Sequence, residues 1–391
     1  MCVICNNSIE SIVHIEDMHI AFCNRIKEIP KELVNIKYLT CFYCRNLTII
    51  PKELVNLKKL SIRGCPNICG IPAEFVELEE LNLILTNFNT PFRISLKYYI
   101  NLRELYCREC PELTEIPREL VKLKFLWLQD CPNIHFLPKE LVNLKNLWWM
   151  NGADMTDTSI PKELVNLYYI TYYGVSEPCI PIELVNLTEI CYDCKNIKEI
   201  PKFINLKKLS CYNCFNLEKI PRELISLVEI DCFNCPELAV IPIELVNLKN
   251  LRCVYSKVRE IPKELINLET LDCSRSSLFN YDGIPKELVN LKIIDCSHTC
   301  IITIPLIKSL ERITCYGCNN LTLVSTHLIY VPQWLKPTIE TNYQTYRKKR
   351  CSLLVNTILE ELIQRTWHPS RMIDWCWDED EKLFMKEYIS N

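Results

Sequence analysis

The sequence predicts an α/β solenoid: a curved, right-handed coil of short turns, with a parallel sheet on the concave face and a small helical cap at the C-terminal end. Two observations carry this prediction. One phrase returns almost unchanged along most of the chain, and the apolar residues keep one phase inside every copy. Residues 1–330 form the predicted array of about 15 turns of 20–23 residues, and residues 331–391 form the predicted cap.

The repeat is marked by an Ile-Pro step. Residues 29–49 read IPKELVNIKYLTCFYCRNLTI and residues 50–70 read IPKELVNLKKLSIRGCPNICG. The marker proline recurs every 20 to 23 residues from position 30 to 305, apart from one gap of 45. That gap contains a degenerate copy of the repeat, SLKYYINLRELYC, with Leu96 in the proline position. A single turn of this length cannot bury its own apolar face, so the turns must stack into a continuous core.

Each turn begins with an alternating segment that predicts a short strand. In LKKLSIR, Leu60 and Ile62 are expected to face the core and Ser61 to face solvent. The following proline ends the extended segment, because it fixes φ and has no amide hydrogen to donate. The ELVNL phrase then predicts about one helical or 3₁₀ turn. Its asparagine suits a left-handed position at the end of that turn; examples are Asn35, Asn56, Asn143, Asn166, Asn247 and Asn290.

The register L-x-x-L-x-(L/C)-x-x-C-x-x-L-x-x-I-P-x-E-L-V-N resembles the leucine-rich repeat, whose pattern is L-x-x-L-x-L-x-x-(N/C)-x-L. The resemblance covers roughly residues 12–330. It implies a horseshoe that binds proteins on its concave face. The phrase IPKELVNLKKL, with its Ile, Asn and Lys bias, also resembles repeat proteins of giant DNA viruses of amoebae. A viral origin would place the protein in the host cytoplasm or in the virion.

Composition narrows the class of partner. The net charge is −3, from 45 basic and 48 acidic residues, which disfavours nucleic acid and anionic membranes as partners. The N-terminal residues lack the pattern of a signal peptide, and no apolar run reaches the ~18–20 residues that span a bilayer. The 25 cysteines are odd in number, which favours reduced thiols in an intracellular, cytoplasmic protein. The oligomeric state is not specified by these features.

The cysteines first suggest metal. Cys191, Cys194, Cys211 and Cys214 have the spacing C-x₂-C-x₁₆-C-x₂-C, which falls within the range of zinc sites. Apart from Cys2/Cys5, however, the C-x-x-C pairs are expected to share one phase of the repeat, and other turns fill the same slots with Ile62 or Ser256. Neither residue is a zinc ligand. We therefore predict no metal and no cofactor.

In the leucine-rich repeats that this chain resembles, the second cysteine slot points inward and bonds to the backbone of neighbouring turns. The residues that match it form the predicted structural cysteine ladder: Cys44, Cys65, Cys110, Cys131, Cys194, Cys214, Cys235 and Cys318. The N-terminal group Cys2, Cys5, His14 and His19 is the one place where core packing and metal binding both stay open.

No catalytic constellation is evident, and we predict a non-enzymatic scaffold for protein–protein interaction. The alternative is a component of a ubiquitin pathway, as a substrate-recognition adaptor or, less favoured, a ligase. Cys376 lies in a C-x-D segment similar to that of bacterial leucine-rich-repeat ubiquitin ligases. Their catalytic domain is much longer than the roughly 60 residues that follow this array. This difference in length favours a cysteine packed in the helical cap over a catalytic one.

The predicted partner surface is a band of aromatic residues at outward strand positions. The second outward position supplies Tyr106, Trp127 and Trp148, and the third supplies Tyr173, Tyr192, Tyr212 and Phe233, followed by Val254. Exposed aromatic rings beside a more acidic C-terminal flank are typical of an interface core with a polar rim. The rings could instead form a ladder that only stabilises neighbouring strands. Both interpretations stay open from the sequence.

The last sixty residues lack the repeat and predict helices. Leu354, Ile358, Leu359, Leu362 and Ile363 form one apolar face, and DEDEKLFMKEY suggests a second helix. A solenoid needs such a cap over its last hydrophobic turn.

Overall fold

The computed structural model describes residues 3–84, 95–150, 160–174, 180–277, 284–305, 307–318, 321 and 323–324. The predicted cap, residues 331–391, and Cys376 lie outside these residues.

Short strands dominate the described part of the chain. Two four-residue helices, α1 (Val3–Asn6) and α2 (Ile9–Ile12), precede the strands, and a 3₁₀ helix, η1 (Leu96–Tyr98), falls between β4 and β5. The strands are β1 (Asp17–Ala21), β2 (Tyr38–Phe42), β3 (Lys59–Arg63), β4 (Glu80–Ile84), β5 (Glu104–Arg108), β6 (Phe125–Gln129), β7 (Asn146–Met150), β8 (Tyr169–Tyr173), β9 (Glu189–Asp193), β10 (Lys208–Tyr212), β11 (Glu229–Phe233), β12 (Asn250–Arg252), β13 (Thr270–Asp272), β14 (Ile293–Asp295), β15 (Thr303–Ile304), β16 (Arg312–Thr314) and β17 (Leu323–Val324).

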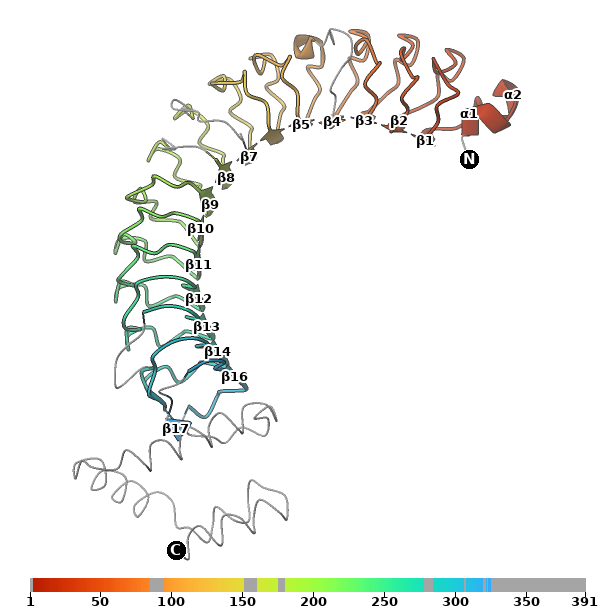
Figure 1. Ribbon diagram of the computed structural model, residues 1–391. Helices are drawn as coiled ribbons and strands as arrows, with labels where there is room; N and C mark the ends of the chain where they lie inside the picture. Colours follow the sequence, from red (N-terminus) through yellow and green to blue (C-terminus); the bar gives the residue numbers. More distant parts are fainter. Residues whose placement is uncertain are drawn as a thin grey trace, which may run out of the picture.

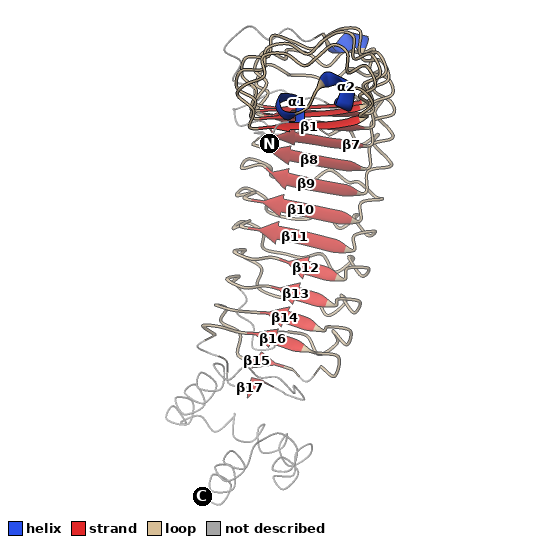
Figure 2. Ribbon diagram, turned by 90° about the vertical axis from the view of Figure 1, so that its right-hand side faces the viewer, coloured by secondary structure: helices blue, strands red, loops and turns tan. Residues whose placement is uncertain are grey.

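The strands form one long sheet of 15 strands in chain order, from β1 to β14 and then β16. Neighbours pair in parallel and in register, so that Leu39 lies beside Leu60 and Leu60 beside Leu81. The sheet lines the inner edge of the arc in Figure 1, and the strands follow one another like rungs in Figure 2. The predicted parallel sheet on the concave face is therefore present. β15 and β17 form a separate two-stranded sheet.

The core is a continuous column inside the coil. Five-residue strands bury their second and fourth residues, as Leu60 and Ile62 do in β3, and leave the other three on the concave face. This alternation is the pleat of a strand with one covered face. Because the turns are stacked in register, the inward residues of successive turns contact one another.

The connections on the convex side are tight turns, which corrects the predicted helical turn. The amide of Leu33 donates to the carbonyl of Pro30 at 3.2 Å, and the amide of Ile36 donates to that of Leu33 at 3.2 Å. These are two consecutive β-turns, and the same bonds follow most marker prolines. Among the described turns, only the degenerate copy, where Leu96 replaces proline, forms a 3₁₀ helix. In the described residues no helix has the length and hydropathy needed to cross a membrane.

The asparagine prediction is also corrected. The asparagines of ELVN are absent from the residues with positive φ; the left-handed position lies directly after the strand, at residues such as Tyr43, Gly64 and Asn213. Each asparagine instead donates its Nδ2 to a carbonyl of the preceding turn, at 3.0 Å from Asn35 to Val13 and 2.9 Å from Asn56 to Val34. At these turns, which lie outside the strands, a side-chain amide can thus replace the backbone hydrogen bonds that join neighbouring turns in the sheet. The same bond holds Asn143, Asn166, Asn186, Asn205, Asn247, Asn267 and Asn290.

Candidate functional site

The centre of the concave face carries a ladder of aromatic rings over β5 to β8. We define the central aromatic ladder as Tyr106, Phe125, Trp127, Trp148 and Tyr169. Ring centroids lie 4.8 Å apart between Tyr106 and Phe125, and 6.0 Å apart between Trp127 and Trp148. Trp148 lies 5.2 Å from Tyr169, and Tyr106 lies 6.0 Å from Trp127. These are contact distances for aromatic pairs, so the rings form one continuous apolar surface.

Sequence reasoning placed Tyr106, Trp127 and Trp148 here but missed Phe125 and Tyr169. These two occupy the first outward position of β6 and β8, one pleat before the tryptophan column. A search that compared all three outward positions of adjacent turns would have found them. The rings of neighbouring strands therefore contact one another, and the outer surface of the ladder faces the hollow of the arc.

Polar atoms on the ladder are only partly satisfied. The hydroxyl of Tyr106 donates to Oε2 of Glu104 at 2.8 Å, and burial together with this carboxylate raises the pKa of Tyr106 well above its usual range. The hydroxyl of Thr171 donates to that of Tyr169 at 2.8 Å. The indole Nε1 of Trp127, by contrast, is buried and has no hydrogen-bond partner in the described structure. A buried unsatisfied donor costs about 1–3 kcal/mol.

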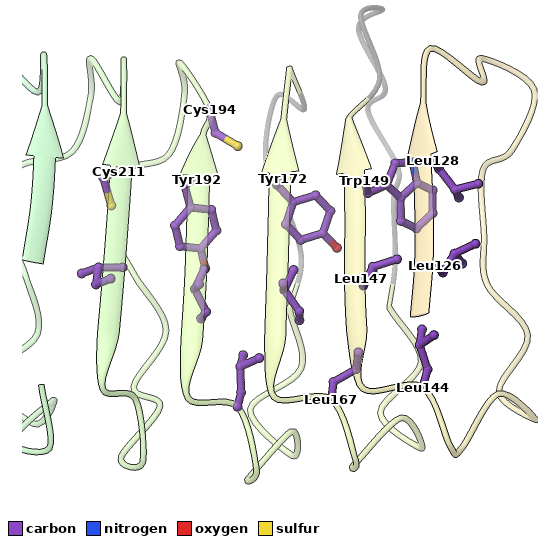
Figure 3. Packing of buried hydrophobic residues seen from close by; sticks show 14 of the residues in the cluster. Leu126, Leu128, Leu144, Leu147, Trp149, Leu167, Tyr172, Tyr192, Cys194 and Cys211 are labelled. Atoms are coloured by element: carbon purple, nitrogen blue, oxygen red, sulfur yellow. The ribbon is translucent and has the colours of Figure 1, made fainter. Parts of the chain in front are cut away.

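Tyr192 does not face the concave surface, and this corrects the prediction. Its side chain is buried, 0 % exposed, and lies in the core beside Tyr172 and Cys211 (Figure 3). β9 pairs Tyr192 with Cys211 and Cys191 with Ser210, so Cys191 faces outward. Burial and the nearby carboxylate of Asp193 raise the pKa of the Cys191 thiol to about 12.

Tyr192 faces inward because the β9 turn has one residue fewer than the next turn between the end of its strand and the following inward cysteine. In the next turn, the left-handed Asn213 stands between the outward Tyr212 and the inward Cys214. The β9 turn passes directly from Asp193 to Cys194, with no residue in that place. The spacing of Cys191 and Cys194 therefore imitates the other C-x-x-C pairs, although Cys191 occupies a different phase. Val254 is also covered, at only 4 % exposed, in a turn whose strand has three residues.

The remaining predicted aromatics lie further along the sheet. Tyr173 ends β8 and is 48 % exposed. Tyr212 donates its hydroxyl to Oδ2 of Asp231 at 3.1 Å, and burial and this carboxylate raise its pKa to about 12. The guanidinium carbon of Arg252 lies 5.0 Å from the ring centre of Phe233, which is a cation–π contact. Tyr212 and Phe233 are adjacent, and both contact the charged part of the surface.

That charged part covers β11 to β16. Arg252 reaches Asp231 and Asp272, each at 3.3 Å, and links three neighbouring strands. Asp295 accepts a hydrogen bond from the backbone amide of Ser297 at 2.9 Å. These side chains line a shallow hollow of about 520 Å³, bounded at its ends by Glu229 and Thr314. The predicted acidic flank is present, and Arg252 neutralises part of it.

A second aromatic group at the N-terminal end was missed from the sequence. Phe22, Phe42 and Tyr43 lie at the ends of β1 and β2, with Phe22 stacked on Tyr43 at 5.5 Å and Phe42 edge-on to Tyr43 at 4.6 Å. Phe22 and Tyr43 both have positive φ, which is uncommon for bulky residues. A Cβ on the next left-handed residue, Gly64, would come within 2.5 Å of the Tyr43 ring, so this position requires glycine.

The eight cysteines of the predicted ladder are all buried. The thiols of Cys44 and Cys131 donate to carbonyls of the preceding turn, Ile20 at 3.4 Å and Cys107 at 3.5 Å. Cys65, Cys110, Cys214, Cys235 and Cys318 make equivalent bonds. Among the described cysteines there is no disulfide. The slot therefore joins neighbouring turns through weak hydrogen bonds.

The N-terminal candidate for metal binding is partly described. Cys2 lies outside the described residues, and the exposed side chain of His19 contacts that of Asp17 at 3.3 Å on β1. Within the parts of the chain that the structure describes, no three His, Cys, Asp or Glu side chains come together as a metal site.

The architecture is that of a leucine-rich-repeat solenoid, and solved structures share it. A leucine-rich-repeat protein of Leptospira interrogans, LIC12759, is similar with a TM-score of 0.59 and 20% identity, over 85% of this chain and 95% of that one. YopM of Yersinia enterocolitica is similar with a TM-score of 0.50 and 19% identity, over 80% of this chain and 74% of that one. No family model and no curated protein matches the sequence. At these identities the likeness shows the fold.

Proposed function

We propose that this leucine-rich-repeat chain is a non-enzymatic scaffold that binds a protein partner on its concave face, with the central aromatic ladder as the main contact. The observation that carries the proposal is the continuous row of rings over β5 to β8, which faces the hollow of the arc. Large aromatic residues dominate the binding energy of protein interfaces when a partner covers them.

Two further features support a protein partner. The indole Nε1–H of Trp127, which has no hydrogen-bond partner in the described structure, would donate a hydrogen bond to a carbonyl of a bound chain once a rotation of the ring exposes it. The charged surface around Arg252 lies on the same sheet, with β9 and β10 between it and the ladder, and would act as a polar rim on that side. The odd number of cysteines, 25, favours an intracellular site of action, which we include in the proposal.

The test replaces Trp127 and Trp148 together with alanine. Partners captured on the immobilised wild-type protein are identified by mass spectrometry and then purified for titration. We expect the double variant to weaken binding of a concave-face partner by about 30-fold or more, since an interface hot spot contributes about 2 kcal/mol. Circular dichroism should be unchanged, because both rings lie on the concave face of the sheet and not in the core.

Phe136→Ala is the matched control. Phe136 is 57 % exposed but lies outside the strands of the concave sheet. Its removal should leave the affinity of the same partner unchanged. Equal binding by the wild type and the double tryptophan variant, with both proteins folded, would reject the ladder as the binding surface.

A further inference from the structure

The cysteine ladder begins with an unusual pair. Cys23 fills the slot of the first turn, where Cys44 and Cys65 follow in the next two. In those turns the slot thiol donates to the turn before it, as Cys44 does to Ile20 at 3.4 Å. β1 is the first strand of the sheet, and α1 stands in the place of an earlier turn. This helix brings Sγ of Cys5 to 3.5 Å from Sγ of Cys23.

We propose that Cys5 and Cys23 are a redox modification site that forms an intramolecular disulfide. This bond fastens the N-terminal cap, which consists of α1 and α2, to the first turn. The two sulfurs must approach by about 1.5 Å to reach the ~2.05 Å of a disulfide bond. A shift of the four-residue helix α1 toward β1 would supply this approach. Ile4 and the buried Ile12 already pack against the core and hold the cap in place.

The exposed thiol starts the reaction. The Cys5 thiolate attacks glutathione disulfide, which gives a mixed disulfide on Cys5 and releases one glutathione thiolate. The Cys23 thiolate then attacks Sγ of Cys5 and releases the second glutathione. Two protein thiols are oxidised, one glutathione disulfide is reduced to two glutathione thiols, and the two protein protons pass to these products. In a reducing glutathione pool the pair stays as two thiols.

The positions of other cysteines make this site selective. Slot cysteines such as Cys44 and Cys65 are fully buried, so an external disulfide cannot reach them. Cys69 is exposed, but its Sγ donates to the carbonyl of Asn67 at 3.7 Å, and no second thiol contacts it within the described residues. Glutathione disulfide should therefore leave Cys69 as a mixed disulfide, which makes it an internal control for Cys5.

The experiment incubates the reduced full-length protein with mixtures of glutathione and glutathione disulfide. Remaining thiols are blocked with N-ethylmaleimide, and the digested protein is analysed by mass spectrometry. We expect a peptide pair joined through Cys5 and Cys23 and glutathione on Cys69. Cys5→Ser should abolish the cross-link, whereas Cys69→Ser should leave it unchanged.

Hydrogen exchange supplies the second measurement. Oxidation should slow amide exchange in residues 3–15 of the wild type and leave it unchanged in Cys5→Ser, whose exposed position makes misfolding a minor concern. A disulfide between Cys5 and Cys2, or a glutathione adduct that persists on Cys5 as it does on Cys69, would overturn the proposal. Unchanged exchange despite the cross-link would reject its capping role.

Discussion

The central turns and the C-terminal turns use the same positions of the repeat in opposite ways. At the fourth strand position, β7, β8 and β9 bury Trp149, Tyr172 and Tyr192. From β10 to β16 the equivalent inward residue is cysteine in every turn: Cys211, Cys232, Cys253, Cys273, Cys296 and Cys315. On the concave side the central turns carry aromatic rings, whereas the C-terminal turns carry Asp and Arg. The repeat thus fixes the fold and leaves both faces of each strand open to change.

The slot after the strand differs as well. Cys235 donates to a carbonyl of the preceding turn at 3.3 Å. Ser256 and Thr299 instead donate to the carbonyl three residues earlier in their own turn, at 2.7 and 2.6 Å. The strands of these two turns, β12 and β14, have three residues, whereas β11, which precedes Cys235, has five.

Replacing Trp149 with alanine tests the largest consequence of the comparison. Trp149 is fully buried and stacked on Tyr172 with ring centres 6.4 Å apart. We expect a loss of about 3–5 kcal/mol of unfolding free energy, since a large buried ring leaves a cavity. Cys253→Ala at the equivalent C-terminal position should cost only about 1 kcal/mol, because it removes one atom.

Urea denaturation followed by circular dichroism measures both variants. Trp148→Ala is the control within the same strand, because Trp148 faces outward and its loss opens no core cavity. Similar losses for Trp148→Ala and Trp149→Ala would contradict the inward and outward assignment of β7. Similar losses for Trp149→Ala and Cys253→Ala would remove the difference between the two regions.

Tyr192→Phe is expected to change the unfolding free energy by a smaller amount and in the opposite direction, toward higher stability. The Tyr192 hydroxyl is buried without a hydrogen-bond partner in the described structure, and burial raises its pKa far above the usual range. Removing an unsatisfied hydroxyl while keeping the ring should raise the unfolding free energy by about 1 kcal/mol. A destabilised Tyr192→Phe protein in the same urea assay would show that this hydroxyl is satisfied and that the core here is polar.

The sequence predicted the coil, the concave sheet and the inward cysteines, because each depends on a period that many copies repeat. It misplaced Tyr192 because one deletion between Asp193 and Cys194 shifts the phase of a single strand without changing the local spacing of cysteines. It missed Phe125 and Tyr169 because contacts between turns join different outward positions. Such contacts depend on register and ring orientation, which a pattern within one turn does not contain.

The same deletion creates the last and smallest expected effect, at Asp193. Burial raises the pKa of this carboxyl, an effect that the amide of Asn213, 3.3 Å from either carboxylate oxygen, only partly offsets. The folded state therefore binds a proton more tightly than the unfolded state, and the ionised carboxylate costs stability. This cost is absent at pH values below the unfolded pKa and is complete above the raised folded pKa. Asp193→Asn should accordingly stabilise the protein at pH 7 and have little effect near pH 3, in urea denaturation at both values.

The control is Glu199→Gln at an exposed position. It should not raise the unfolding free energy at pH 7, because Lys219, 2.8 Å away, lowers the pKa of Glu199. A stabilisation by Asp193→Asn that is equal at both pH values would mean that the charge of Asp193 has no part in it.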